Sequence, residues 1–224
     1  MVFASLLRYV NMGRKDGWDD RFSIPYFWKL MADKYSVGIN YIISEHGLDD
    51  ICEKCDGLIV PGSSNDINPS YWGGEPFSGN VAYDEFPFDA KVIDWFVKHN
   101  KPIFGVCGGL QSINVHLGGS LKKIDPKMHS GAENKNHIIN VKENSFVYDV
   151  FKSTKADVNT YHNWAIDRLA PGFEVVAKSE DDVIEAIECK EKRIFATQWH
   201  PERNFSEGDP IENKFFENFI NLCK

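Results

Sequence analysis

The chain has 224 residues, of which 42% are hydrophobic and 26% are charged, and its formal net charge is −8. This composition is that of an ordinary globular protein and excludes a disordered, collagen-like or coiled-coil chain. The acidic balance argues against a surface that binds nucleic-acid phosphates or anionic lipid, so a small-molecule partner is favoured.

Neither a membrane span nor a disulfide framework is expected. No hydrophobic run approaches the roughly 18 residues that cross a bilayer, and residues 1–7 lack the basic start of a signal peptide. The five cysteines are an odd, scattered set, which fits a reducing compartment. We therefore expect a cytoplasmic protein with free thiols, and its length predicts a single domain over residues 1–224.

The first half of the chain alternates short apolar runs with longer amphipathic segments, which predicts βαβ units around a mostly parallel sheet. Strands are expected at residues 2–7, 37–43, 57–60 and 102–106. Helices are expected at residues 23–34, 84–99 and 109–117. Residues 62–82, rich in Gly, Ser, Asn and Pro, form a long connection of a kind that often carries function.

The second half changes character. Shorter strands joined by turns are expected at residues 138–141, 173–177, 183–188 and 194–198, followed by a helix at residues 210–223. The whole pattern predicts a doubly wound α/β fold whose mostly parallel sheet carries a small antiparallel extension.

A cysteine follows the fourth predicted strand. Cys107 lies where that buried strand ends and a helix begins, and Gly105, Gly108 and Gly109 permit a tight turn, as in a nucleophile elbow. A helix N-terminus favours the thiolate and offers N–H groups to an oxyanion. A small buried structural cysteine is the alternative for this segment taken alone.

A histidine and a carboxylate follow the last predicted strand as His200-Pro201-Glu202. A thiol nucleophile needs an imidazole to take and return its proton, and a carboxylate orients that imidazole. In an extended segment alternate side chains share one side, so His200 and Glu202 are expected to face the same way. A surface histidine beside a surface glutamate is the alternative.

Both segments resemble a known family. The run from Gly105 to Gln111 fits the Gly-x-Cys-x-Gly-x-Gln elbow of class I glutamine amidotransferase domains, and residues 198–202 fit their His-x-Glu ending. Residues 60–69, 159–165, 169–172, 175–177 and 184–188 resemble the γ-glutamyl-γ-aminobutyrate hydrolase branch, the peptidase C26 group. The likeness covers most of the chain from about Gly57, and the first fifty residues match much less well.

The resemblance implies a flavodoxin-like fold and assigns roles to individual positions. The catalytic triad would be Cys107, His200 and Glu202. The oxyanion donors would be the backbone amides of Gly108 and of Gly62, with Ser63 as its neighbour. The residues that the resemblance places around the substrate are Gln111, Ser63, Tyr161 and His162.

Three departures from the branch bear on the substrate. Gly108 stands where the branch usually has Arg, Phe88-Asp89 stands for its Arg-Asp pair, and His162-Asn163 stands for two adjacent histidines. The triad is intact, but the departures leave the identity of the leaving amine open.

The function implied is a cysteine-dependent hydrolase that cleaves a γ-glutamyl amide through a thioester on Cys107 and releases glutamate and an amine. The alternative is a glutaminase subunit that passes ammonia to a synthase partner. The intact triad disfavours a third interpretation, a non-catalytic binding protein. No metal or organic cofactor is expected, and a homodimer is left open.

Three other features give weaker signals. Cys52 and Cys55 have the spacing of a zinc half-site but lack a second ligand pair, so a structural role is expected. In the segment 8–22, Arg8 or Arg21 either pairs with a substrate carboxylate or phosphate or belongs to a solvated loop. His129, Ser130 and His137 lie between the two motifs, and no Gly-x-Ser-x-Gly frames the serine, which disfavours a serine hydrolase.

Overall fold

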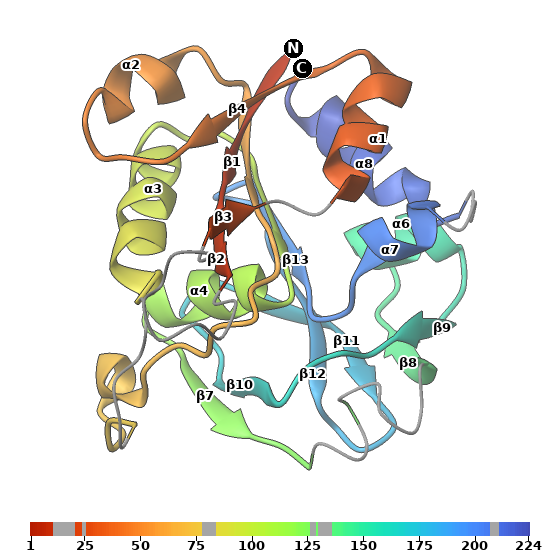
Figure 1. The fold of residues 1–224 in the computed structure, drawn as a ribbon. Coiled ribbons are helices and arrows are strands. Elements are labelled where there is room, and N and C mark those ends of the chain that lie inside the picture. The colour runs from red at the N-terminus through yellow and green to blue at the C-terminus, as the bar shows by residue number, and fades with distance from the viewer. Residues whose placement is uncertain (11–20, 24–25, 78–83, 126–128, 130–135, 207–210) are drawn as a thin grey trace.

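The computed structural model describes residues 1–10, 21–23, 26–77, 84–125, 129, 136–206 and 211–224 (Figure 1). A nine-stranded sheet forms its centre, in the order β4-β1-β5-β6-β13-β12-β11-β8-β9. Five neighbouring strands are parallel: β4 (Gly38–Ile42), β1 (Val2–Leu6), β5 (Gly57–Val60), β6 (Ile103–Val106) and β13 (Ile194–Thr197). Numbered along the chain, their order is 2-1-3-4-5, the flavodoxin-like order. The predicted fold class is confirmed.

Four antiparallel strands continue the same sheet beyond β13: β12 (Ile184–Cys189), β11 (Glu174–Ser179), β8 (Asn136–Val141) and β9 (Lys155–Asn159). Two further ribbons pair β7 (Ser120–Lys123) with β10 (Trp164–Arg168), and β2 (Arg8–Val10) with β3 (Arg21–Ser23). The sequence did not predict β7 or β9, because both are short and polar: Lys122 and Lys123 are exposed on β7, and Lys155 and Asp157 are exposed on β9.

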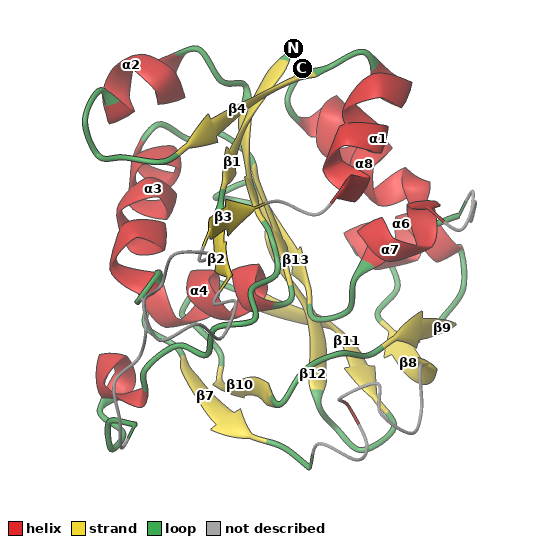
Figure 2. Cartoon of the chain, in the orientation of Figure 1, coloured by secondary structure: helices red, strands yellow, loops and turns green. Residues whose placement is uncertain are grey.

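Helices cover both faces of the sheet (Figure 2). One face carries α2 (Leu48–Glu53), α3 (Phe86–Lys98) and α4 (Gly108–His116), and the other carries α1 (Tyr26–Tyr35), α6 (Phe146–Phe151), α7 (Pro201–Ser206) and α8 (Asn213–Leu222). A short 3-10 helix, η1 (Pro69–Trp72), lies in the long connection after β5. The predicted helix at residues 23–34 starts later than expected, since residue 23 ends β3.

Strand side chains alternate between two hydrophobic cores. On β5, Leu58 and Val60 pack towards α3 and α4, whereas Ile59 packs with the aromatic residues of α1 and α8. All three are fully buried, as expected for a parallel strand covered on both faces. Because both faces of β5 and β6 are packed, the positions of their carboxyl ends are fixed, and residues of the candidate site follow directly after each of these ends.

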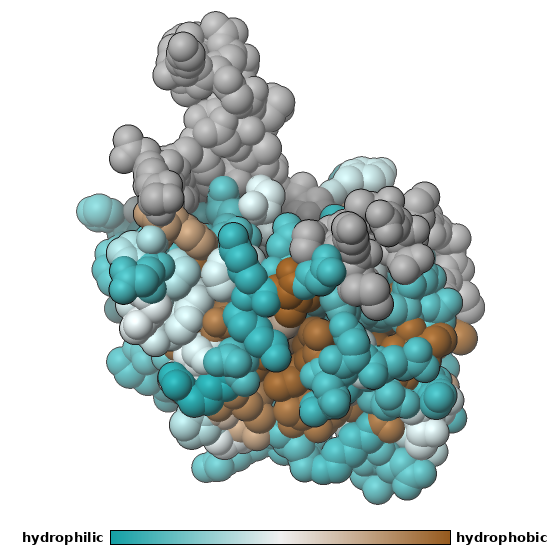
Figure 3. Space-filling model, turned by 90° about the horizontal axis from the view of Figure 1, so that it is seen from below, coloured by the Kyte–Doolittle hydropathy of each residue, from teal (hydrophilic) through white to brown (hydrophobic). Residues whose placement is uncertain are grey.

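The surface is mostly polar, with local apolar areas. Seen from below, hydrophobic residues form a broken band between hydrophilic ones (Figure 3). Within the described part of the chain, none of the helices has the length and hydrophobicity needed to cross a membrane.

Candidate active site

Cys107 lies at the junction between β6 and α4, in an unusual backbone conformation. Its φ is 50° and its ψ is −107°, which non-glycine residues rarely adopt. The backbone is held there by its N–H, which donates to the carbonyl of Thr197 at 2.7 Å. Such strained residues concentrate at functional sites, and here the strain aims a side chain that is only 5% exposed.

Glycines allow two loops to approach this cysteine. A Cβ at Gly109 would lie 1.9 Å from the carbonyl oxygen of Val60, so α4 can only start this close to β5 with glycine. A Cβ at Gly108 would lie 2.8 Å from the backbone nitrogen of Ser63. A Cβ at Gly62 would lie 2.7 Å from Cε1 of His200 and 3.5 Å from Cβ of Cys107. The loop after β5 therefore packs closely against both the nucleophile and the histidine.

His200 and Glu202 form a buried pair beyond the end of β13. Nδ1 of His200 lies 2.6 Å from Oε1 of Glu202, and the two side chains are 8% and 2% exposed. Their local structure differs from the extended segment expected from the sequence. Pro201 instead begins α7, a position that suits its fixed φ and missing N–H, so Glu202 lies in the first turn of a helix.

The charge on His200 follows from its neighbours. Burial disfavours its charged form, but the negative charges of Glu202 and Cys107 outweigh burial and raise the pKa of His200 to about 10. The imidazole is therefore protonated at neutral pH. An imidazolium between a carboxylate and a thiolate is the state from which a cysteine hydrolase starts.

Asn159, at the end of β9, fixes the backbone of His200. Its Nδ2 donates to the His200 carbonyl at 2.8 Å, and its Oδ1 accepts the His200 N–H at 2.9 Å. The sequence offered no physical signal for this role, because the contact joins residues 41 positions apart.

Two glutamines lie beside the nucleophile. Nε2 of Gln111 donates to the carbonyl of Trp164 at 2.9 Å and to Oε1 of Gln198 at 3.2 Å. Gln198 in turn points its Nε2 at the sulfur of Cys107, 3.6 Å away. The sequence placed Gln111 at the substrate, whereas its amide group is here buried and engaged within the protein. Gln198 was not predicted, and its amide is the one that contacts the thiol.

Of the other residues expected around the substrate, Tyr161 lies near the triad and His162 lies away from it. The ring of Tyr161 lies 6.0 Å from that of His200, with the guanidinium of Arg203 4.1 Å above the tyrosine. His162 points elsewhere: its Nδ1 lies 3.0 Å from the carbonyl of Trp164 and its Nε2 lies 3.4 Å from Glu185. Tyr161 thus borders the triad, while the buried His162 belongs to a separate cluster.

Arg8 is fully engaged within the protein. Its Nη1 lies 2.8 Å from both carboxylate oxygens of Asp89, and its Nε and Nη2 donate to the carbonyl of Pro61. The pair is 5% and 3% exposed. Arg8 therefore ties the loop that carries Gly62 to α3, which corrects the suggestion that it meets the substrate. Within the same segment, residues 11–20 and the side chain of Arg21 lie outside the described part.

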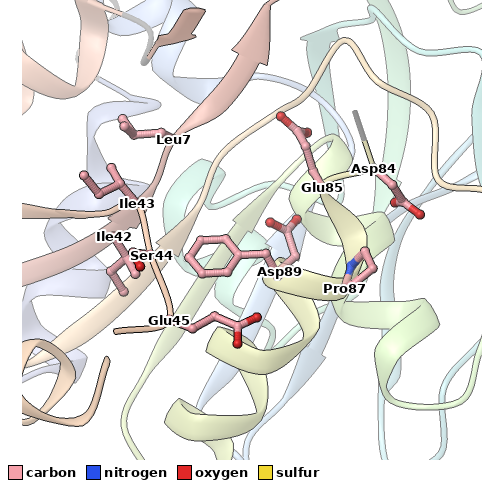
Figure 4. A pocket seen from close by; sticks show the side chains of 10 residues that line it. Leu7, Ile42, Ile43, Ser44, Glu45, Asp84, Glu85, Pro87 and Asp89 are labelled. Atoms are coloured by element: carbon pink, nitrogen blue, oxygen red, sulfur yellow. The ribbon is translucent and has the colours of Figure 1, made fainter. Parts of the chain in front are cut away.

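A pocket of about 330 Å³ is lined in part by Asp89, the carboxylate that pairs with Arg8 (Figure 4). Its walls come from the ends of β1 and β4 and from the start of α3, and include Glu45, Asp84 and Glu85. Glu85 accepts a hydrogen bond from the hydroxyl of Ser63 at 2.6 Å. The pocket is thus next to the loop of Gly62, although neither Cys107 nor His200 lines it.

The Cys52 and Cys55 pair has a structural environment. Both residues lie in the hydrophobic core, and burial raises the pKa of Cys52 to about 12. Lys101 donates hydrogen bonds to the carbonyls of Cys52, Glu53 and Cys55 and so closes the end of α2. The thiols are held in the protonated form, which does not suit metal binding.

Comparisons with known proteins identify the family of the chain. The model of the Peptidase C26 family matches residues 30–202. The glutamine amidotransferase-like protein YvdE of Lactococcus lactis is 33% identical over 177 residues, covering 74% of this chain and 73% of that protein. The γ-glutamyl-γ-aminobutyrate hydrolase PuuD of Escherichia coli is 27% identical over 211 residues, covering 87% and 83%.

A solved structure from Thermoplasma acidophilum, described as a subunit of GMP synthase, superposes over all of this chain and 94% of that one. The TM-score is 0.69 at 23% identity, which shows a shared fold. The family model covers more than half of the chain and includes Cys107, His200 and Glu202. The chain therefore belongs to the peptidase C26 family.

Proposed function

We propose that the protein is a hydrolase of a γ-glutamyl amide, with Cys107 as nucleophile, His200 as acid and base, and Glu202 as the group that orients His200. The observation that carries the proposal is the convergence of a strained cysteine at a helix N-terminus with a buried histidine hydrogen-bonded at 2.6 Å to a carboxylate.

The first half of the reaction forms a thioester. The Cys107 thiolate attacks the γ-carbonyl carbon, forming a C–S bond and a tetrahedral oxyanion. Backbone N–H groups at Gly108 and Gly62 stabilise that oxyanion. The N–H of Gly108 is in the first turn of α4, where the amides have no partner within the helix, and the N–H of Gly62 belongs to the loop after β5. His200 then gives its proton to the amine nitrogen as the C–N bond breaks, and the free amine leaves.

The second half returns the enzyme. Neutral His200 takes a proton from a water molecule, which attacks the thioester carbonyl. The C–S bond breaks, glutamate is released, and the thiolate re-forms beside the newly protonated His200. Glu202 stabilises the imidazolium in both halves and needs no proton of its own.

The same triad also serves the alternative, a glutaminase subunit that delivers ammonia to a synthase. The 33% identity to YvdE, named as glutamine amidotransferase-like, favours this candidate, whereas the similarity to PuuD favours the hydrolase. In either case we treat residues 1–224 as one domain, because strands from residue 2 to residue 197 share one sheet.

Glutamate release by the purified chain separates the two candidates. The panel should contain free glutamine and γ-glutamyl amides of anionic, neutral and cationic amines, because the pocket beside the Gly62 loop carries four carboxylates. We expect strong turnover of one γ-glutamyl amide by the chain alone, and loss of that turnover in Cys107→Ala. Activity on glutamine alone, or only with an added partner, would favour the amidotransferase subunit, and activity retained by Cys107→Ala would refute both.

A further inference from the structure

A second cluster of titratable groups lies away from the triad, around Glu185 on β12. Three histidine nitrogens face one oxygen of this carboxylate, Oε1. The distances are 3.4 Å from Nε2 of His162, 3.5 Å from Nε2 of His137 and 3.8 Å from Nδ1 of His129. Glu185 is 0% exposed. These residues come from distant parts of the chain and share no sequence motif.

The cluster lacks the hydrogen bonds that a buried carboxylate normally makes. Neither oxygen of Glu185 has a hydrogen-bond partner within the described residues, and the same holds for Nε2 of His137 and of His162. A buried ion without partners costs several kcal/mol, so native proteins rarely leave one. Four such atoms gathered around one point indicate a missing ligand.

Two of the histidines use the ring nitrogen that faces away from Glu185 to donate a hydrogen bond. Nδ1 of His162 donates to the carbonyl of Trp164 at 3.0 Å, and Nε2 of His129 donates to Asp181 at 2.9 Å. With those nitrogens donating, Nε2 of His162 and Nδ1 of His129 are the ring nitrogens that remain to bind a ligand beside the carboxylate. The Thr160 hydroxyl, 3.5 Å from Nδ1 of His129, already donates to the His129 carbonyl at 2.8 Å. A cation among these nitrogens and the Glu185 carboxylate would bind all of them at once.

We propose that His129, His137 and Glu185 bind a divalent transition-metal ion such as Zn²⁺, with Nε2 of His162 as the fourth ligand. The candidate ligand atoms of the first three lie within 4.8 Å of one another. Metal bonds of about 2.0–2.1 Å in a tetrahedron separate ligand atoms by about 3.3–3.4 Å. The distances from Oε1 of Glu185 to Nε2 of His162 and of His137, 3.4 Å and 3.5 Å, are close to that value. The proposal revises the expectation from sequence that no metal is bound.

The outer hydrogen bonds of the histidines also fit a metal centre. Histidine ligands usually donate their other N–H to a carboxylate or a carbonyl, as His129 does to Asp181 and His162 to Trp164.

The site would brace the protein behind the nucleophile. The carbonyl of Glu185 accepts the N–H of Gln198, whose side chain contacts Cys107. The backbone N–H of His162 donates to the His129 carbonyl at 2.7 Å, next to Tyr161. All four ligands belong to the antiparallel half of the protein or to its connections, so the ion is assigned a structural role.

Metal binding tests the proposal without reference to activity. The full chain, with Cys107→Ala to remove the triad thiol as a competing ligand, is stripped with a chelator and titrated with ZnCl₂ against a chromophoric chelator. We expect one Zn²⁺ per chain. CoCl₂ should give the intense visible absorption of a four-coordinate Co²⁺ site, which an octahedral surface site would not give.

Matched variants locate the ion. His137→Asn removes the imidazole of the partly exposed ligand, and Glu185→Gln removes the charge of the central carboxylate while keeping the shape of the side chain. Each should weaken Zn²⁺ binding at least about 100-fold, since even changes to the groups that orient metal ligands cost about 10–100-fold. His116→Asn is the control, because His116 is also half-buried beside a carboxylate, Asp94 at 3.9 Å. Should Glu185→Gln fail to fold, His137→Asn decides.

Two results would overturn the proposal. One is no stoichiometric uptake by the parent chain, which would mean that protonated histidines alone balance Glu185. The other is uptake that survives His137→Asn but is lost in Cys52→Ser/Cys55→Ser, which would place the ion at the cysteine pair.

Discussion

Two buried glutamate–histidine groups of this protein differ in geometry. Glu202 contacts one histidine, with a direct hydrogen bond of 2.6 Å to His200. Glu185 contacts three, at 3.4–3.8 Å, and makes no hydrogen bond with any of them among the described residues. The first spacing suits a shared proton, and the second suits an ion between the groups.

The difference shows that residue type alone does not define a site. Both groups combine a carboxylate with imidazole, and both are almost completely buried apart from His137, whose side chain is 15% exposed. The triad pair is also next to Cys107, whose charge helps to keep His200 protonated. The described residues of the Glu185 cluster include no thiol, so its charge balance depends on histidine protons or on a metal. The predictions below separate the two groups.

The largest expected effect is that of His200→Asn. Loss of the imidazole that contacts Cys107 should reduce kcat by about 10⁴–10⁶-fold, as for the nucleophile and base of other triads. Zinc uptake by the Glu185 cluster should be unchanged. Steady-state kinetics and zinc titration on the same preparation check both points. A fall in kcat below about tenfold would remove His200 from its assigned role.

Glu202→Gln should reduce kcat by about 10²–10⁴-fold, less than loss of the base itself. It should also change the pH profile. Glu202 and Cys107 together raise the pKa of His200 to about 10, so a variant without the Glu202 charge should lose its imidazolium at lower pH, and the alkaline limb of kcat/KM should move to lower pH.

The same shift predicts how stability depends on pH. The contribution of His200 to the free energy of unfolding should be complete below its ordinary pKa of 6.5 and be lost as the pH rises through about 10. Denaturant titrations at several pH values measure this. An alkaline limb and a stability profile identical in parent and Glu202→Gln would contradict the pairing.

Gly62→Ala should reduce kcat by about 10–10³-fold, the range expected when an oxyanion donor is displaced. The added Cβ would lie 2.7 Å from Cε1 of His200, so the loop or the imidazole must move. Ser63→Ala, which keeps every backbone N–H, should cause a smaller fall. Equal losses in the two variants would argue that the Ser63 hydroxyl, rather than the loop amide, matters.

The smallest effect concerns the metal and rests on thermal stability. Zinc at about a hundred times its dissociation constant should raise the unfolding midpoint by about 5–10 °C, since about 2.7 kcal/mol is gained and a domain of this size shifts about 2–4 °C per kcal/mol. The shift should persist in His200→Asn and disappear in His137→Asn. A zinc shift that persists in His137→Asn would count against the Glu185 cluster.

Much of the parallel half could be predicted because its signals are local. The strand predicted at residues 57–60 has the bounds of β5. The turn at Cys107 is marked in the sequence by glycines, which the close approach of neighbouring backbone requires there. The antiparallel half was harder. Its strands β7 and β9 carry exposed lysines, and β9 ends in Asn159, whose contact with His200 depends on pairing across the sheet.

Local hydrophobic periodicity was enough to predict an α/β fold with a mostly parallel sheet, and short motifs were enough to predict Cys107, His200 and Glu202 as triad candidates, because both signals act over a few residues. The resemblance carried by those motifs supplied the family and, with it, the flavodoxin-like fold. Packing in three dimensions was needed to show that Arg8 anchors the Gly62 loop, that Gln198 rather than Gln111 contacts the thiol, and that His129, His137 and His162 gather at Glu185. These contacts join residues 23 to 91 positions apart, and such distances are set by strand order and burial rather than by spacing along the chain.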